Sequence, residues 1–295
     1  MKIAIYGQQI QPNTERILEK VFTTLAPYTS EISVEKNYFE LLIAQNPVYC
    51  NYKTFSNASD LNPNTTVLIS IGGDGTILRA ATFVKDKNIP ILGINAGRLG
   101  FLATIPEENI ETWLPKIYTK EYKISSRSLL ELSTDAPEQP HQNINFALNE
   151  ISVTRKDTTS MITIDTYLDG EYLTSYWADG LIVATPTGST GYSLSCGGPV
   201  LTPEVNSLVI TPIAPHNLNA RPLVIPDTTD VMLKVSGRED NYWVSLDARM
   251  ASVNNQTTLH IKKAPFQIQL IEFIEEGFLK TIRKKLLWGE DKRNL

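Results

Sequence analysis

The sequence predicts a two-part fold, an α/β domain followed by a domain built from β-strands. Three observations support this prediction. The chain has 295 residues, of which 42% are hydrophobic, and this length favours two domains over one. Strand-like and helix-like segments alternate over roughly the first hundred residues, as expected for a parallel sheet covered by helices. After Tyr122, short runs rich in Thr, Val, Ile and Tyr are separated by Asp, Asn, Gly and Pro, which is typical of antiparallel strands.

The first domain is predicted to be Rossmann-like in the loose sense, because apolar strands alternate with helices along it. The expected elements are strands at 2–6, 66–71 and 90–94 and helices at 14–25, 76–84 and 106–118. In the last of these helices, the apolar face would be formed by Ile110, Trp113, Leu114 and Ile117.

The second domain is predicted to be β-sandwich-like, because short strands follow one another without intervening helices. The expected strands lie at 151–154, 162–168, 181–184, 209–213, 231–235, 242–246 and 259–262. Asp169-Gly170 predicts a hairpin turn.

Helical spacing returns at 276–288, and we expect this last helix to pack back on the first domain. Its basic residues are expected on a solvated face; they are Lys280, Arg283, Lys284 and Lys285. The predicted boundaries are 1–120 with about 265–295 for the α/β domain, and 121–264 for the β-rich domain.

Composition and charge exclude several classes of function. The chain has 32 acidic and 27 basic residues, so its formal charge of -5 disfavours binding to nucleic acid. Cys50 and Cys196 form no metal or disulfide pattern. The first apolar run stops at Gly7, too early for a secretory signal, and no stretch approaches the ~18 apolar residues of a membrane span. We therefore expect a cytoplasmic protein that does not bind membranes.

The most informative segment is 67–76, where an apolar strand runs into a glycine-rich turn and then into a helix. The turn and the helix start contain the candidate phosphate-binding residues Gly72, Gly73, Asp74, Gly75, Thr76 and Arg79. Three glycines let the backbone turn sharply and aim N–H groups at an oxyanion, with help from the helix N-terminus. Asp74 would repel phosphate, so its position favours contact with magnesium or with a substrate hydroxyl. The alternative is that Asp74 only caps the helix.

The turn is not a Walker loop, and the chain lacks the motifs of protein kinases. At this point the sequence resembles the superfamily shared by NAD kinases, diacylglycerol-type lipid kinases and phosphofructokinases.

A second segment, 178–199, combines an acid, a buried strand and a hydroxyl-rich glycine turn. The hydroxyl groups offered to phosphates, ribose or adenine belong to Thr187, Ser189, Thr190, Tyr192 and Ser195. The segment lacks the second glycine of a serine-hydrolase elbow. A hydroxyl-decorated structural turn is the alternative interpretation.

The second segment closely resembles the signature of NAD kinases. Three further segments carry the same resemblance, at 95–101, 149–150 and 216–223, and together they extend over about 1–249 in the family's order. The resemblance implies transfer of the terminal phosphoryl group of ATP to the 2′-hydroxyl of the adenosine ribose of NAD. It also implies a homodimer or homotetramer, and a magnesium ion carried by ATP without a fixed protein site.

The resemblance also implies roles for individual residues. Asp74 matches the proton acceptor at the reacting ribose hydroxyl, with Gly75 in the same pocket. Asn149 and Glu150 match a pair that holds the nicotinamide-side ribose. Phe101 matches an aromatic residue at the adenine pocket.

The remaining matches lie in the second domain. Asp179 matches an acid that binds the nicotinamide end, often from a neighbouring subunit, and Ala214 falls near a further contact. The wall that receives adenine and its ribose matches Thr190, Gly191, Tyr192 and Ser195.

The sequence departs from the family pattern at two positions. Gly191 stands where alanine is usual, which should loosen the turn. Arg249 stands where many members have glutamine, and it would contact a substrate phosphate or pair with a surface acid.

Three alternative functions stay open. A lipid kinase shares the Gly-Gly-Asp-Gly-Thr turn, and a non-catalytic nucleotide-binding module would use the same loops. A dinucleotide-binding oxidoreductase fits less well, because the spacing of Gly93, Gly97 and Gly100 misses the fingerprint.

Overall fold

The computed structural model describes residues 1–135, 144–156 and 160–288, which form two compact units. Unit 1 contains Met1–Ser126 and the chain from Ile268 onward, and unit 2 contains Arg127–Gln267. Unit 1 is the α/β part and unit 2 the β-rich part, so the predicted fold class is confirmed.

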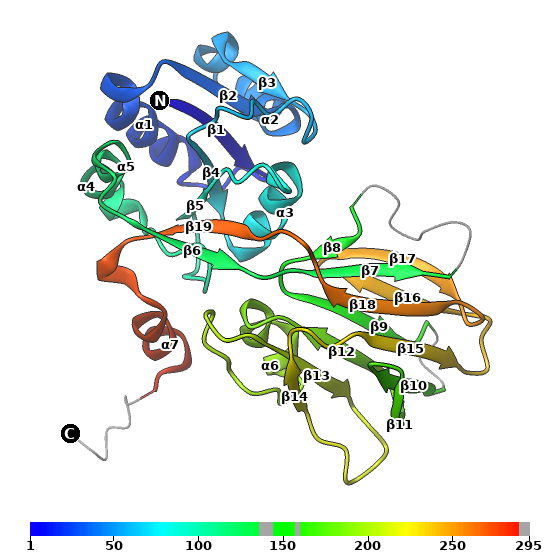
Figure 1. The fold of residues 1–295 in the computed structure, drawn as a ribbon. Coiled ribbons are helices and arrows are strands. Elements are labelled where there is room, and N and C mark those ends of the chain that lie inside the picture. Colours follow the sequence, from blue (N-terminus) through cyan, green and yellow to red (C-terminus); the bar gives the residue numbers. More distant parts are fainter. Residues whose placement is uncertain (136–143, 157–159, 289–295) are drawn as a thin grey trace. The chain divides into compact units, whose positions relative to one another are not determined.

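Unit 1 is built on one seven-stranded sheet with the order β3-β2-β1-β4-β5-β19-β6 (Figure 1). The strands are β1 (Lys2–Gly7), β2 (Glu31–Glu35), β3 (Lys53–Phe55), β4 (Val67–Gly72), β5 (Ile91–Asn95), β6 (Lys123–Arg127) and β19 (Ile268–Glu272). From β3 to β19 the neighbouring strands run parallel. Because β19 lies beside β5, the chain returns to unit 1 after completing unit 2.

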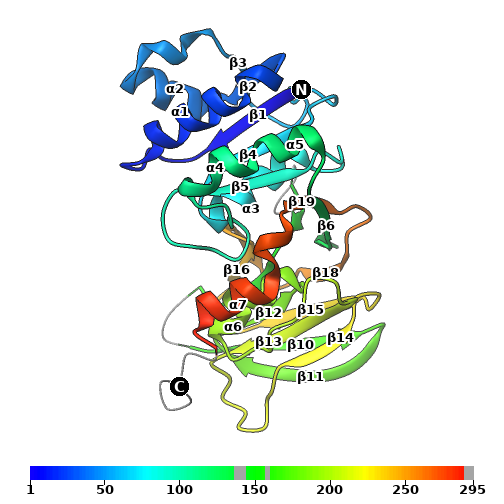
Figure 2. The ribbon, with the colours of Figure 1, turned by 90° about the vertical axis from the view of Figure 1, so that its left-hand side faces the viewer.

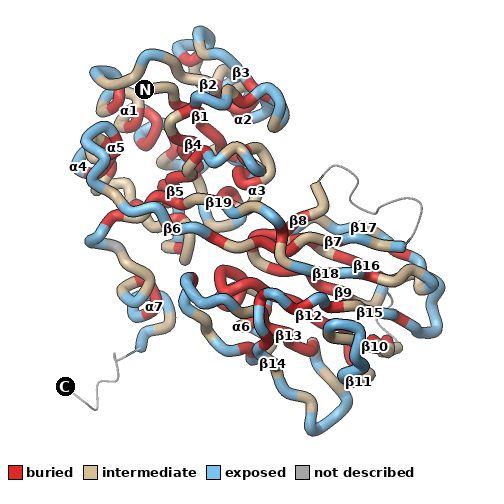
Figure 3. Tube along the Cα trace, in the orientation of Figure 1, coloured by how far each residue is buried: buried red, intermediate tan, exposed pale blue. Residues whose placement is uncertain are grey.

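Helices cover both faces of this sheet. They are α1 (Thr14–Leu25), α2 (Lys36–Gln45), α3 (Asp74–Val84), α4 (Ile110–Trp113) and α5 (Pro115–Thr119). Helix α7 (Phe278–Leu286) follows β19 in the same unit. Helices α1 and α4 lie side by side, and their buried residues share one core with Ile5 and Ile69 (Figures 1 and 2). On the other face, the ring of Tyr6 lies 5.1 Å from that of Phe83 in α3. Buried residues accordingly follow the central strands β1, β4 and β5 (Figure 3).

Unit 1 differs from the prediction in three respects. The helix expected at 106–118 is a 3₁₀ turn at Glu107–Asn109 followed by the short helices α4 and α5. Pro115 starts the second of these, because proline has no N–H to donate and fits only a first helical turn. The last helix is shorter than 276–288 and spans Phe278–Leu286. Between α1 and β4, the structure contains β2, α2 and β3, which the sequence pattern did not predict.

Unit 2 consists of two six-stranded sheets whose inner faces share one apolar core. The first sheet has the order β11-β10-β15-β18-β7-β8, with β7 (Leu130–Thr134), β8 (Phe146–Ala147), β10 (Ile162–Leu168), β11 (Glu171–Ala178), β15 (Val231–Ser236) and β18 (Thr258–Lys263). The second has the order β14-β13-β12-β9-β16-β17, with β9 (Glu150–Thr154), β12 (Gly180–Ala184), β13 (Ser207–Ile213), β14 (Leu223–Pro226), β16 (Asn241–Leu246) and β17 (Arg249–Asn254). The paired strands are antiparallel, as a sandwich requires.

The predicted hairpin at Asp169-Gly170 is confirmed, since both residues have positive φ, at 50° and 85°, as a tight hairpin turn requires. In the described part of the chain, no helix combines the length and the apolar character needed to cross a membrane.

Candidate active site

The glycine turn lies at the carboxyl end of β4, beside the end of β1. The strand order changes direction here, because β2 lies on one side of β1 and β4 on the other. In open α/β sheets, ligands bind at the carboxyl ends of strands at such a switch point. Gly72 has a φ of 153°, and a Cβ there would collide with the hydroxyl of Thr76. Glycine at position 72 therefore allows both the turn and the close approach of Thr76.

Asp74 connects this turn to the loop that follows β5. Its Oδ2 accepts the N–H of Phe101 at 2.7 Å, and its Oδ1 accepts the N–H groups of Leu102 and Ala103 at 2.9 and 3.0 Å. Gly100 lies so close to the carboxylate that any side chain there would collide with it. The carboxylate thus holds the segment 101–103 in place.

The interpretation of Asp74 as a helix cap is wrong. The N-cap residue of α3 is Gly73, and Asp74 is the first helical residue, with its carboxylate bonded outside the helix. A carboxylate has about four acceptor positions. Since three are used, the Oδ2 atom can still accept one hydrogen bond from a ligand.

The other candidate residues of unit 1 lie either next to Asp74 in the sequence or in the segment that its carboxylate binds. Gly73 and Gly75 are exposed, and the N–H of Gly75 belongs to the first turn of α3, where no helical carbonyl is available to it. Arg79 is exposed one turn further on, and Phe101 is half-buried, with the Lys285 ammonium 5.9 Å from its ring centre. The N-terminal end of the α3 dipole and the cations Arg79 and Lys285 together favour the binding of an anion near this turn.

In unit 2, Asn149 and Glu150 lie at the start of β9, directly opposite the end of β12. Glu150 pairs with Ala184, and the Asn149 carbonyl accepts the N–H of Thr185 at 2.9 Å. Glu150 is only 8% exposed. Yet within the described residues, neither its Oε2 nor the Oδ1 of Asn149 has a hydrogen-bond partner. Buried acceptors without donors are rare and costly, which points to a ligand that supplies the donors.

Asp247 holds this pair in position and was not predicted from the sequence. Its side chain is 4% exposed, and it accepts the N–H groups of Leu148, Asn149 and Glu150 at 3.0, 2.8 and 3.3 Å. The available signal was an acid placed directly after the buried strand β16. The sequence shows that an acid follows this strand, but it does not show that the acid binds the backbone N–H groups of 148–150.

Burial and, to a smaller extent, the nearby Asp247 carboxylate raise the pKa of Glu150 to about 7, although the Tyr192 N–H acts in the opposite direction. Burial also raises the pKa of Asp247. Two carboxyl groups are therefore held close together in a site with little water, where ionisation of Glu150 is costly.

Arg249 supports the same region from the other side. Its guanidinium donates to the carbonyl groups of Ile144, at 2.9 Å, and Phe146, and lies 3.7 Å from Asp247. Of the two roles considered, pairing with an acid is the one observed, although that acid is buried. The guanidinium therefore stabilises β8 and the Asp247 carboxylate.

The hydroxyl-rich segment forms a 3₁₀ turn, Thr187–Thr190, and the short helix α6 (Tyr192–Ser195) after β12. Thr190 donates to the Thr187 carbonyl at 3.1 Å, and the Thr187 hydroxyl accepts from Arg127 at 3.4 Å. Ser189 is fully buried and bonds to Pro186 and Leu201, so its predicted role as a ligand donor is wrong. Tyr192 and Ser195 are exposed at the surface.

Gly191 lies against the buried pair. A Cβ at this position would lie 3.0 Å from Oε2 of Glu150 and 3.2 Å from Nδ2 of Asn149. Glycine at position 191 therefore leaves more room beside the Glu150 acceptor and the Asn149 amide than a residue with a side chain would.

Asp179 and Ala214 lie at the other end of β12. Asp179 pairs with Arg155 at 3.1 Å, and its N–H bonds to Ile213, the residue before Ala214. Burial raises the pKa of Tyr192, and the charges of Cys196, Asp179 and Glu150 raise it further.

The candidate residues accordingly form two groups. The glycine turn, Arg79 and Phe101 gather around Asp74 in unit 1, and the others gather around β9, β12 and α6 in unit 2. In the described part of the chain, no three His, Cys, Asp or Glu side chains lie together as a metal site would need.

Comparison with known proteins identifies the family. Residues 8–122 match the ATP-NAD kinase N-terminal domain, and residues 148–273 match the ATP-NAD kinase C-terminal domain. The chain belongs to the ATP-NAD kinase family. It is 60% identical to the NAD kinase of Flavobacterium psychrophilum over 294 residues, which cover all of both chains. It is 41% identical to an NAD kinase of Bacteroides fragilis over 293 residues, 99% of this chain and 100% of the relative.

Solved structures agree with this assignment. Yeast NADH kinase complexed with NADH superimposes with a TM-score of 0.85 at 25% identity, covering 98% of this chain and 88% of the yeast chain. An NAD kinase from Archaeoglobus fulgidus in complex with ATP gives a TM-score of 0.72 at 28% identity, with 97% of each chain covered. The family predicted from the two glycine-rich segments is confirmed.

The raised pKa of Glu150 predicts a pH-dependent cost to stability. An unfolded glutamate loses its proton near 4.5 and native Glu150 near 7, so stability falls as pH rises through this window, by up to about 3 kcal/mol. We expect Glu150→Gln, which cannot ionise, to stabilise the ligand-free protein at pH 8 by ~1–3 kcal/mol and much less at pH 5. Urea unfolding at both pH values measures this difference.

The matched control is Glu204→Gln, which changes an exposed glutamate of unit 2. Equal effects of Glu150→Gln at pH 5 and pH 8 would contradict the assignment.

Proposed function

We propose that this protein is an NAD kinase, which transfers the terminal phosphoryl group of ATP to the 2′-hydroxyl of the adenosine ribose of NAD and so forms NADP. The observation that carries the proposal is the pair of buried acceptors, Oδ1 of Asn149 and Oε2 of Glu150, that lack donors among the described residues. Neighbouring ribose hydroxyls are donors of the required kind and number. The names of the relatives support the same reaction.

We assign the chemistry to Asp74. Its Oδ2 orients the 2′-hydroxyl and takes up the proton as the bond from oxygen to phosphorus forms and the bond to ADP breaks. Phosphoryl transfer depends mainly on positioning and on stabilising the charge of the moving oxygens. The three N–H groups that bind the Asp74 carboxylate supply that positioning, because they fix its orientation before the substrate arrives.

The phosphates of ATP are assigned to the backbone of 72–75 and to the N-terminus of α3, with Arg79 as a counter-charge. Magnesium is assigned to ATP, because Asp74 has a single free acceptor position and the described residues contain no group of three His, Cys, Asp or Glu side chains that could hold a metal ion. When bound, the ion neutralises charge on the phosphates.

The remaining contacts follow the family resemblance. Asn149 and Glu150 hold the nicotinamide-side ribose, and Phe101 contacts adenine. The wall around adenine and its ribose consists of Thr190, Gly191, Tyr192 and Ser195, with the turn at Thr187 behind it and Ala214 as a further contact. Asp179 binds the nicotinamide end from a neighbouring subunit of a homodimer or homotetramer. We place the reaction in the cytoplasm, where free cysteines such as Cys50 and Cys196 stay reduced.

A direct assay tests the reaction. Purified protein with magnesium, ATP and NAD should form NADP, measured through an NADP-specific dehydrogenase, and should not phosphorylate diacylglycerol offered in parallel. Phosphorylation of the lipid would support the lipid-kinase alternative, and no turnover of either acceptor would support a non-catalytic module.

Asp74→Asn tests the catalytic assignment. We expect the turnover number for NADP formation to fall by at least ~100-fold, the usual scale for loss of a general base, with NAD binding largely retained. The amide nitrogen cannot accept an N–H of 101–103, so the melting temperature should fall as well. Turnover must therefore be measured per folded protein, with the exposed Asp86→Asn as the control. Near-normal turnover would remove Asp74 from the mechanism.

Glu150→Gln tests the binding assignment. The neutral amide loses a charge-assisted hydrogen bond to the ribose, so we expect NAD to bind about tenfold or more weakly at pH 8. Equilibrium titration of NAD gives the affinity directly. A pure turnover defect with unchanged affinity would contradict the role of Glu150.

A further inference from the structure

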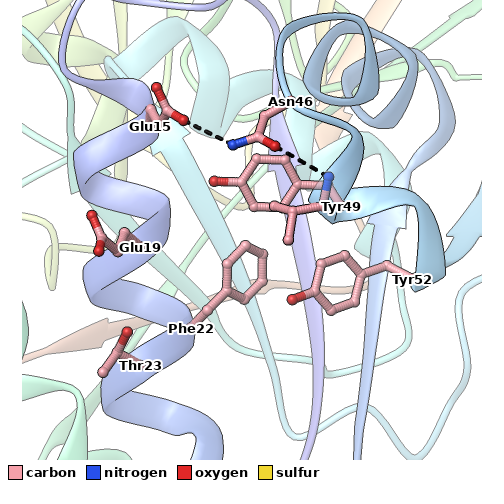
Figure 4. Close-up of a pocket in the computed structure, with 8 residues that line it drawn as sticks. Glu15, Glu19, Phe22, Thr23, Asn46, Tyr49 and Tyr52 are labelled. Atoms are coloured by element: carbon pink, nitrogen blue, oxygen red, sulfur yellow. Dashed lines mark hydrogen bonds between the residues drawn. The ribbon is translucent and has the colours of Figure 1, made fainter.

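Unit 1 contains an open cavity of about 390 Å³ that the proposed reaction does not use (Figure 4). It lies between α1 and the 3₁₀ turn Pro47–Asn51. The cavity is lined by Glu15, Glu19, Phe22, Thr23, Asn46, Val48, Tyr49 and Tyr52. None of these residues belongs to the glycine turn or to the loop at 101–103.

Three aromatic rings form one side of the cavity. Phe22 and Tyr52 are stacked with their centres 4.8 Å apart, and Tyr49 lies 5.7 Å from Phe22. A flat ligand between two rings needs a separation of about 7 Å, two contacts of ~3.5 Å, so these rings cannot enclose a nicotinamide or adenine ring. The remaining ring faces carry negative charge density, which attracts cations.

Two carboxylates stand on successive turns of α1, the helix that also carries Phe22, and face the side of the cavity that contains Tyr49 (Figure 4). Glu15 and Glu19 are four residues apart, so they lie on one helix face and repel each other. The basic residues beside them, Arg16 and Lys20, both pair with Glu107.

The structure provides only a neutral partner for these carboxylates. The Asn46 side-chain amide donates to Glu15 at 3.0 Å. Among the described residues, no cation contacts Glu15 or Glu19. The cavity therefore has an excess of negative charge.

The hydroxyl of Tyr49 points toward α1 (Figure 4). Tyr49 is 7% exposed as a residue, while its hydroxyl keeps access to the solvent of the cavity and makes no hydrogen bond to a described residue. Burial raises the pKa of Tyr49, and the charges of Glu15, Tyr52 and Glu19 contribute. A largely buried side chain thus directs its hydroxyl into the cavity, where a ligand can bond to it.

We propose that this cavity binds a small organic cation, a guanidinium or protonated amine on an aliphatic stem. The cationic group donates to the carboxylates of Glu15 and Glu19, and the Tyr49 hydroxyl accepts a further hydrogen bond. The stem lies against Phe22 and Tyr52. A guanidinium suits this combination of carboxylates and aromatic rings, because its planar group donates several hydrogen bonds and also packs on aromatic faces.

Other ligand classes fit the cavity less well. The negative charge disfavours nucleotides and other phosphates. A hard metal ion prefers six or more oxygen ligands, whereas this cavity has two carboxylates and the described residues contain no group of three metal-ligating side chains.

Calorimetric titration of the full chain with agmatine, which carries a guanidinium and an amine, tests the proposal. We expect saturable binding that N-butylurea, a neutral compound of similar shape, does not reproduce. Glu19→Gln should weaken agmatine binding about tenfold or more, and Tyr49→Phe should weaken it less. Glu111→Gln, which changes an exposed glutamate of α4, should leave it unchanged.

Three results would overturn the proposal. The first is that agmatine does not bind the wild-type protein, and the second is that N-butylurea binds equally well; neither depends on the folding of a variant. The third is that magnesium chloride binds with the same dependence on Glu19, which would make the cavity an inorganic cation site. Thermal unfolding of each variant shows whether a loss of binding is local.

Discussion

In each of the two units, one carboxylate accepts three consecutive backbone N–H groups and holds the candidate residues beside it in place. In unit 1, Asp74 binds the N–H groups of 101–103, and in unit 2, Asp247 binds those of 148–150. Segment 148–150 leads into β9, and segment 101–103 lies in the loop after β5, so the sheets supply few acceptors to their backbone. The carboxylates thus hold two irregular segments in fixed positions.

The same arrangement has a cost in stability. Asp247 fixes Glu150 in a buried site near its own carboxylate, so the ligand-free protein carries a poorly solvated charge and an acceptor without a donor among the described residues. In the function proposed above, ribose hydroxyls of NAD relieve both costs. Such a loss of stability in the ligand-free protein is typical of functional sites, because the groups that bind a ligand are often unfavourable for folding.

Features encoded by neighbouring residues were predictable from the sequence, and features encoded by distant ones were not. The glycine turn after β4 and the hydroxyl-rich segment after β12 are local patterns, and both were placed correctly. The partners of Asp247 lie 97 to 99 residues away, and no periodicity reveals them. Asp74 was ambiguous for the same reason, since a local pattern suggests a helix cap whereas the partners lie 27 to 29 residues further on. In β2, only Val34 and Glu35 are buried, which leaves too little alternation to mark a strand.

The assignment of the 2′-hydroxyl to Asp74 is tested most directly by a crystal structure of the protein with bound NAD. We expect the 2′-oxygen of the adenosine ribose to lie within hydrogen-bond distance of Oδ2 of Asp74, at roughly 2.6–3.2 Å, while the bonds from 101–103 stay in place. A well-defined NAD whose 2′-oxygen lies outside this distance, with Asp74 bonded only to its own backbone, would contradict it.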